Sequence, residues 1–141
     1  MPWQNIQING DRNTVSNATG AELGAQLYLT TQNPADLQWA VQMYNWTRGC
    51  LLNADGLYGD HINGQGQVDP TEWTYNQGTM IGAGVMLYQA THNSGYLAQA
   101  EATATRTLAL IRGLLLDLLA DGDTDRVTAA WRAGRQPGAG A

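Results

Sequence analysis

Residues 19–40 (TGAELGAQLYLTTQNPADLQWA) and residues 79–100 (TMIGAGVMLYQATHNSGYLAQA) align without a gap when the chain is shifted by 60 positions. Eight of the 22 aligned positions are identical, where average composition would give roughly one or two. In the first copy the identical residues are Thr19, Gly24, Leu27, Tyr28, Thr31, Asn33, Leu37 and Ala40. The chain therefore contains an internal repeat.

Each copy of the repeat predicts a helix, a tight turn that contains Thr-x-Asn, and a second helix. In the first copy Asn33 and Pro34 give a cap and a first-turn proline, and Leu37, Val41 and Tyr44 then follow helical spacing. Helical hairpins in tandem pack side by side into solenoids or closed rings. We expect an all-α chain, with helices at about residues 17–31, 34–51, 75–90 and from 94 onward.

The segment between the two copies differs in character from the helices. Residues 58–62 and 65–68 flank Asn63-Gly64, a pair that suits a type I′ turn, so we predict one short β-hairpin insertion here. Residues 1–16 are polar and predict no regular element.

The C-terminal part departs from the repeat. The leucine-rich stretch Leu108–Leu119 is too short to span a bilayer and predicts a buried helix. A short helix that reaches Trp131 and a loose tail from about residue 134 are expected beyond it. We treat residues 1–141 as a single partial domain, with residues 106–141 as its divergent C-terminal end.

Composition narrows the function classes. Charged residues make up 13% of the chain, its seven basic residues are all arginines, and twelve acids bring the net charge to −5. This balance disfavours binding to a phosphate backbone. The single cysteine, Cys50, excludes an internal disulfide and a cysteine-based zinc site.

Acids, amides and aromatic residues gather in the linker and at the start of the next helix. Asp60, Trp73 and Tyr75 stand among them, and such residues suit carbohydrate, because ring faces stack on aromatics and hydroxyls bind carboxylates and amides. The competing interpretation is a solvated loop under which the aromatics pack. We expect no metal ion or other cofactor, and we expect His61 to face solvent.

Two of these stretches carry a family resemblance. Residues 53–62 (NADGLYGDHI) and residues 73–83 (WTYNQGTMIGA) resemble glycoside hydrolase family 76, the α-1,6-mannanase family. The resemblance covers about residues 12–105. It implies a partial α/α toroid, a fragment of a six-hairpin ring with a sugar-binding cleft, and mannan-type oligosaccharide or polysaccharide as the partner. It also implies a carboxylate at Asp60 that faces this cleft.

Retaining cleavage needs two carboxyl groups about 5 to 5.5 Å apart. The family's pair is two consecutive aspartates upstream of the matched part, and this sequence has no consecutive acids. We therefore expect a glycosidase-like protein whose chain alone is incomplete and inactive. Within the chain, the other candidate for a hydrolytic carboxyl pair is Asp60 with Glu72, across the base of the hairpin. The predicted substrate-binding residues are Asp60, Trp73, Tyr75, Asn76 and Gln77.

Two other functions stay open at this point. One is a non-catalytic sugar-binding protein or degenerate remnant, and the other is a helical module that self-associates through exposed helix faces as a homo-oligomer. Relatives in the family are usually secreted or at the cell surface, whereas the N-terminus shows no secretory signal pattern and the chain no membrane-spanning stretch.

Overall fold

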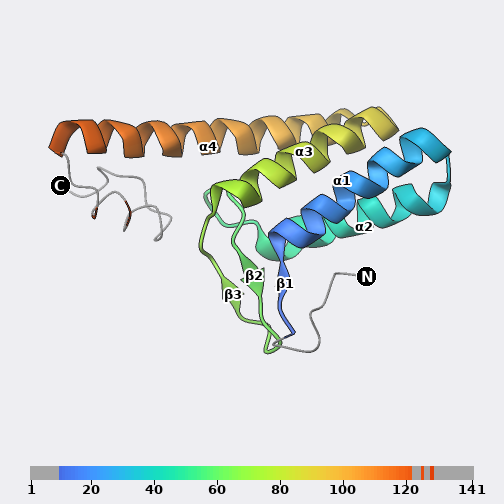
Figure 1. The fold of residues 1–141 in the computed structure, drawn as a ribbon, viewed down its shortest axis with the longest axis horizontal. Coiled ribbons are helices and arrows are strands. Elements are labelled where there is room, and N and C mark those ends of the chain that lie inside the picture. The colour runs from blue at the N-terminus through green and yellow to red at the C-terminus, as the bar shows by residue number, and fades with distance from the viewer. Residues whose placement is uncertain (1–9, 122–124, 126–127, 129–141) are drawn as a thin grey trace.

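The computed structural model describes residues 10–121 together with Asp125 and Thr128 (Figure 1). Four helices and a small three-stranded sheet make up this part of the chain. In chain order the elements are β1 (Arg12–Asn13), α1 (Thr14–Thr31), α2 (Pro34–Leu51), β2 (His61–Ile62), β3 (Val68–Asp69), α3 (Thr74–Thr91) and α4 (Ser94–Asp121).

The helices form two hairpins, α1 with α2 and α3 with α4, as the repeat predicts. The hairpins meet through α1 and α3, which lie side by side, and α2 also reaches α3 (Figure 1). The sheet lies at the end of the molecule where α1 and α3 begin (Figure 1). The all-α prediction with one short β insertion is therefore confirmed.

The repeat holds at the level of single hydrogen bonds. The helices α1 and α3 are each followed by one left-handed residue, Gln32 with φ 57° and His92 with φ 56°. The backbone N–H of each donates to the carbonyl oxygen four residues earlier, at 2.8 and 2.7 Å. Asn33 and Asn93 then cap the second helices by accepting a backbone N–H two residues later, at 3.2 and 2.9 Å.

The two hairpins also share a close helix crossing. A Cβ placed on Gly24 would lie 2.9 Å from the carbonyl oxygen of Asp36, and one on Gly84 would lie 3.1 Å from that of Tyr96. Each glycine is thus the point where the first helix of a hairpin contacts the backbone of the second. This contact explains why the repeat keeps glycine at both positions.

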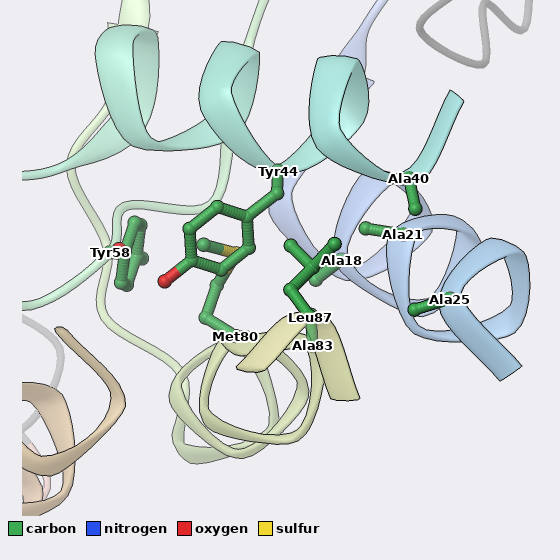
Figure 2. Close-up of a cluster of buried hydrophobic side chains, with 9 residues drawn as sticks. All are labelled: Ala18, Ala21, Ala25, Ala40, Tyr44, Tyr58, Met80, Ala83 and Leu87. Atoms are coloured by element: carbon green, nitrogen blue, oxygen red, sulfur yellow. The ribbon is translucent and has the colours of Figure 1, made fainter. Parts of the chain in front are cut away.

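The core lies between α1, α2 and α3 (Figure 2). Small side chains on α1 meet larger ones on α3, and Tyr44 and Tyr58 close one side (Figure 2). The cluster consists of Ala18, Ala21, Ala25, Ala40, Tyr44, Tyr58, Met80, Ala83 and Leu87.

The β-hairpin is present, but the prediction of a type I′ turn at Asn63-Gly64 is wrong. The residue with positive φ is Gly66, at 82°, and not Gly64. The N–H of Gly66 donates to the carbonyl oxygen of Asn63 at 3.0 Å, which fits a type I turn closed by a left-handed glycine. The Asn63 side chain also accepts from the backbone N–H groups of Gln65 and Gln67. These bonds favour a loop that is longer than the predicted two-residue turn.

The prediction that residues 1–16 form no regular element is wrong from Arg12 on, because residues 14–16 are the first turn of α1 and Arg12–Asn13 form a strand. This pair is the strand β1, which pairs antiparallel with β2 in the register Arg12 with Ile62 and Asn13 with His61. The strand is two residues long and has no alternating pattern of its own. Only its pairing with a segment about 50 residues away in the chain makes it a strand.

The prediction of a buried helix at Leu108–Leu119 is also wrong. Leu110 and Leu114 do pack with Leu57 in a second small cluster, but Leu108 is 66% and Leu119 74% exposed. Leu108 lies within the first 18 residues of α4 and is exposed because it stands on another face of the helix than Leu110. Leu119 is exposed because α4 has 28 residues and α3 has 18, so α4 extends past its neighbour (Figure 1).

The C-terminal predictions fall mostly outside the described residues. The expected short helix to Trp131 and the tail from about residue 134 belong to that part. Among the helices that the structure describes, none is long and apolar enough to cross a membrane.

Candidate functional site

Asp60 is fixed in space by its own backbone. Its N–H donates to the carbonyl oxygen of Asp69 at 2.9 Å, and its carbonyl oxygen accepts the N–H of Thr14 at 2.9 Å. The Thr14 hydroxyl donates to the carbonyl oxygen of Gly59 at 2.6 Å. The start of α1 and the end of β3 therefore hold Asp60 from two sides.

Gly59 allows the backbone to approach this closely. A Cβ at this position would lie 2.8 Å from the carbonyl oxygen of Asp69 and 3.2 Å from Cα of Pro70. Because both neighbours are backbone atoms, they have little freedom to move away, and only glycine fits.

The Asp60 carboxylate collects donors from three residues. Oδ1 accepts from Nδ2 of Asn76 at 3.2 Å and lies 3.5 Å from the hydroxyl of Tyr75, while Oδ2 lies 3.0 Å from Nδ1 of His61. The side chain is 22% exposed. Asp60 is thus a fixed acceptor with one side open to solvent.

Tyr75, whose hydroxyl lies next to this carboxylate, is one of two stacked aromatic rings. The rings of Trp73 and Tyr75 are stacked, with centroids 6.1 Å apart and planes 7° apart. Tyr75 is 50% exposed, and partial burial followed by the negative charge of Asp60 raises the pKa of its hydroxyl. The pair offers an aromatic edge and face next to a charged acceptor, which is the combination that sugars bind.

Gln77 lies beneath this surface. It is 2% exposed, its Oε1 accepts the N–H of Tyr58 at 2.8 Å, and its Nε2 donates to the carbonyl oxygens of Tyr58 and Trp73 at 2.8 and 3.1 Å. The amide therefore ties the linker to the start of α3. Its geometry suits a positioning role, and the prediction of direct sugar contact stays a prediction.

Asn76 is fully buried and bonds Asp60 through Nδ2. Its Oδ1 is buried with no hydrogen-bond partner within the described part of the chain. Of the five predicted site residues, the structure thus brings Asp60, Trp73 and Tyr75 to one surface and places Asn76 and Gln77 beneath it.

His61 does not face solvent as predicted. Its side chain is 24% exposed, with Nδ1 at Asp60 and Nε2 3.7 Å from a carboxylate oxygen of Asp11. Asp60, His61 and Asp69 each offer one ligand atom, and these atoms lie within 4.8 Å of one another. These three residues could hold a cation, although the Asp60 carboxylate already has the partners described above.

Glu72 lies apart from Asp60 in its bonding. It is 3% exposed, and its Oε1 accepts from Nδ2 of Asn53 at 2.7 Å. Burial raises the pKa of the Glu72 carboxyl to about 7, against the lowering effect of the Asn53 bond, and nearby Asp55 adds to the rise. Glu72 therefore joins the two ends of the linker through Asn53. These contacts do not support Glu72 as the catalytic partner of Asp60.

Sequence patterns did not reveal Thr14 as part of the site. Its role depends on contacts to residues 59 and 60 across the fold. The available signal was its position at the start of α1, shortly before the aligned segment, where Thr74 stands at the corresponding position of α3.

Comparison with known proteins identifies the chain's relatives. The model of the glycosyl hydrolase family 76 matches residues 1–120. The chain belongs to this family. It is 33% identical over 100 residues to the mannan endo-1,6-alpha-mannosidase DCW1 of Saccharomyces cerevisiae, and the match covers 64% of this chain and 22% of that protein.

Solved structures of the family agree with the fold. The GH76A α-1,6-mannanase from Salegentibacter sp. HEL1_6 matches with a TM-score of 0.65 and 35% identity, over 70% of this chain and 31% of that one. A GH76 α-mannanase from Bacteroides thetaiotaomicron matches with a TM-score of 0.70 and 28% identity, over 89% of this chain and 41% of that one. The chain thus corresponds to part of an α/α toroid and spans well under half the length of these relatives.

Proposed function

We propose that this chain binds α-1,6-linked mannose chains at the surface formed by Asp60, Trp73 and Tyr75. The observation that carries the proposal is Asp60, whose backbone is held from two sides and whose carboxylate lies next to Tyr75, one of two stacked rings. The substrate class comes from the family, in which an inactive variant of the Salegentibacter enzyme is in complex with alpha-1,6-mannotetrose.

Each group has a distinct role in this proposal. The exposed side of the Asp60 carboxylate accepts hydrogen bonds from sugar hydroxyls. Tyr75 and Trp73 stack on a ring face. Asn76 and Gln77 act as positioning residues, because the first holds the carboxylate and the second holds the backbone on which Trp73 stands.

Cleavage needs more than this surface provides. A retaining glycosidase uses two carboxyl groups on either side of the scissile bond, and the sequence has no consecutive acids. Glu72 does not supply the second group, since it is buried and bonded to Asn53. We therefore assign this chain substrate recognition within a mannanase framework, and we assign no cleavage step to Asp60 or Glu72.

Calorimetric titration with α-1,6-mannotetraose tests the binding. We expect heat of binding for the wild-type chain and at least a tenfold weaker affinity for Asp60→Ala and Trp73→Ala. The matched controls are Asp36→Ala, at a carboxylate bonded to Thr31 in a turn, and Trp39→Ala, at a 44% exposed ring on α2. Both controls should bind like the wild type.

Two further measurements separate the competing functions. An α-1,6-glucan tetrasaccharide should bind more weakly than the mannose ligand. Assay of reducing ends should show no release from mannan, as expected for recognition alone. Equal affinity of all four variants, or no heat from a folded chain at millimolar sugar, contradicts the proposal.

A further inference from the structure

Glu72 has one carboxyl oxygen whose bonding the fold leaves open. The side chain is 3% exposed, and its Oε1 accepts from Nδ2 of Asn53 at 2.7 Å. Its Oε2 is buried and has no hydrogen-bond partner among the described residues. A buried polar atom without a partner is costly, and an ionised one costs more than a neutral one. The surroundings of Glu72 therefore favour its neutral form.

The side chain that lies next to Glu72 is a second carboxyl group. Asp55 is within hydrogen-bonding reach of Glu72, and burial, together with the charge of Asp55, raises the pKa of the Glu72 carboxyl. Asp55 is exposed, and its Oδ1 accepts the backbone N–H of Leu57 at 3.0 Å. Two ionised carboxylates only accept and repel each other, whereas a protonated one can donate its O–H to the other. One proton would thus satisfy both groups.

The neighbouring elements supply no positive charge that acts on Glu72 within the described part of the chain. On β3, the Asp69 carboxylate accepts the N–H of Thr71 at 2.9 Å. On α4, the exposed Arg106 lies beside Gly56, where its Nε would be 3.8 Å from an added Cβ. Asp55 is therefore the charge that decides how Glu72 titrates, and a proton takes the place of a salt bridge.

We propose that Glu72 carries a proton on Oε2 and donates it to the Asp55 carboxylate, and that this bond closes the linker between α2 and α3. The bond joins the start of the linker, at Asp55, to its end, at Glu72. It adds to the tie through Asn53, whose Nδ2 also donates to the carbonyl oxygen of Pro70 at 3.1 Å. When the proton leaves to solvent, a buried carboxylate with one donor faces the charge of Asp55, and the closure is lost.

The closed linker positions the candidate site. Glu72 directly precedes Trp73, whose carbonyl oxygen accepts the N–H of Asn76 at 3.1 Å, and Asp60 stands on the segment that the shared proton closes. Glu72 is thus a positioning residue, and loss of its proton should weaken sugar binding. This consequence rests on the proposed function, whereas the shared proton does not.

Amide hydrogen exchange followed by NMR from about pH 5.5 to 8 tests the shared proton without sugar. Protection is measured relative to an unstructured peptide at the same pH. The amides of Asn53, Gly56 and Gly59 are bonded within the linker or to the end of α2, and we expect them to lose at least tenfold in protection across this range. The bonded amides of Gln32 and His92 in the two hairpin turns should keep theirs.

Two variants remove the titration by different routes. Glu72→Gln keeps an acceptor for Asn53 and gives Asp55 an N–H donor at every pH. Asp55→Asn removes the opposing charge and offers a donor to an ionised Glu72. Both should keep the protection of the linker constant, with unchanged helical circular dichroism. Glu101→Gln, at an exposed glutamate on α4, is the matched control and should lose protection like the wild type.

Calorimetric titration with α-1,6-mannotetraose gives the second readout. The wild type should bind at least threefold more weakly at pH 8 than at pH 5.5, and Glu72→Gln should show a smaller loss. The two proteins have to be compared, because His61 lies beside Asp60 and histidine changes its charge in the same pH range.

The outcomes separate this proposal from the sugar-binding proposal. Constant protection of the linker amides in the wild type overturns the shared proton, and so does an equal loss of protection in the wild type and in either variant. Protection that depends on pH, with no heat from sugar, supports the shared proton and contradicts the sugar-binding proposal. An equal pH dependence of sugar affinity in the wild type and Glu72→Gln shows that the proton does not position the site.

Discussion

The first hairpin, α1 with α2, and the second, α3 with α4, share one register through their first helices and turns and then diverge. After Leu51 the first hairpin ends, and the chain turns through Asn53 and Gly56, which has φ 91°. At the aligned Ile111 the second hairpin continues as helix to Asp121. The repeat thus specifies how the two helices of each hairpin cross. The segments that follow differ, because a linker follows the first hairpin and a helical extension ends the second.

The divergence also separates the candidate site from the packing of helices. The linker after α2 carries Asp60 and leads to Trp73, whereas the extension of α4 carries exposed leucines. On α2, Tyr44 and Leu51 are 1% exposed because α1 and α3 both lie against that helix. Their counterparts on α4 are Ala104, which is half-buried, and Ile111, which is exposed.

The largest expected effect tests the shared crossing. Gly24→Ala and Gly84→Ala each place a methyl group about 3 Å from a backbone carbonyl oxygen, and each should lower the free energy of unfolding by about 2 kcal/mol. Urea unfolding measures this loss. The control Gly49→Ala, with nothing within 4 Å of its Cβ in the described structure, should instead gain about 0.5 to 1 kcal/mol. A cost at only one of the two crossings would show that the hairpins are not equivalent.

The next prediction concerns the linker, where Glu72 should make the free energy of unfolding depend on pH. Within the described part of the chain, neither hairpin has a group with this effect. Burial holds the pKa of Glu72 near 7, above its ordinary value of 4.5, so the folded state binds this proton more tightly than the unfolded state. Stability from this group is fully present below pH 4.5 and is lost as pH rises from there to about 7.

Glu72→Gln should remove that loss, which thermal unfolding from pH 4.5 to 8.5 measures. Asp69 does not obscure the result, because hydrogen bonds from Thr71 lower its pKa below 3.8 and its contribution changes only in more acidic solution. Parallel pH profiles of the variant and the wild type would contradict the role assigned to Glu72.

The smallest effect concerns the two turns. Asn33→Ala and Asn93→Ala each remove one side-chain cap and should cost about 1 kcal/mol. Chemical denaturation of the two variants side by side should give matching losses. A clear difference would show that Pro34, which follows only the first cap, changes what the cap contributes.

The turns were predictable because their signals are local. Thr31, Asn33 and their counterparts Thr91 and Asn93 bond within a few residues, so the repeat alone located both hairpins. The grouping of Asp60 with Trp73, Tyr75 and Asn76 also followed from their closeness in the chain.

Features that depend on distant contacts were not predictable in this way. The strand β1 exists only through pairing with β2. The hairpin turn depends on the two backbone N–H groups from which the Asn63 side chain accepts, those of Gln65 and Gln67. The exposure of Leu119 follows from the relative lengths of α3 and α4, and periodicity within α4 does not carry that information.

The hairpin loop at residues 64–66 has a consequence for how the protein tolerates change. These three residues are exposed and lie at the far end of the sheet from the helices (Figure 1), while Asp60 is anchored at the near end by Thr14 and Asp69. Insertions at exposed loop tips are generally well accepted. A fluorescent label or an extra peptide could therefore be attached at this tip while the carboxylate keeps its anchorage.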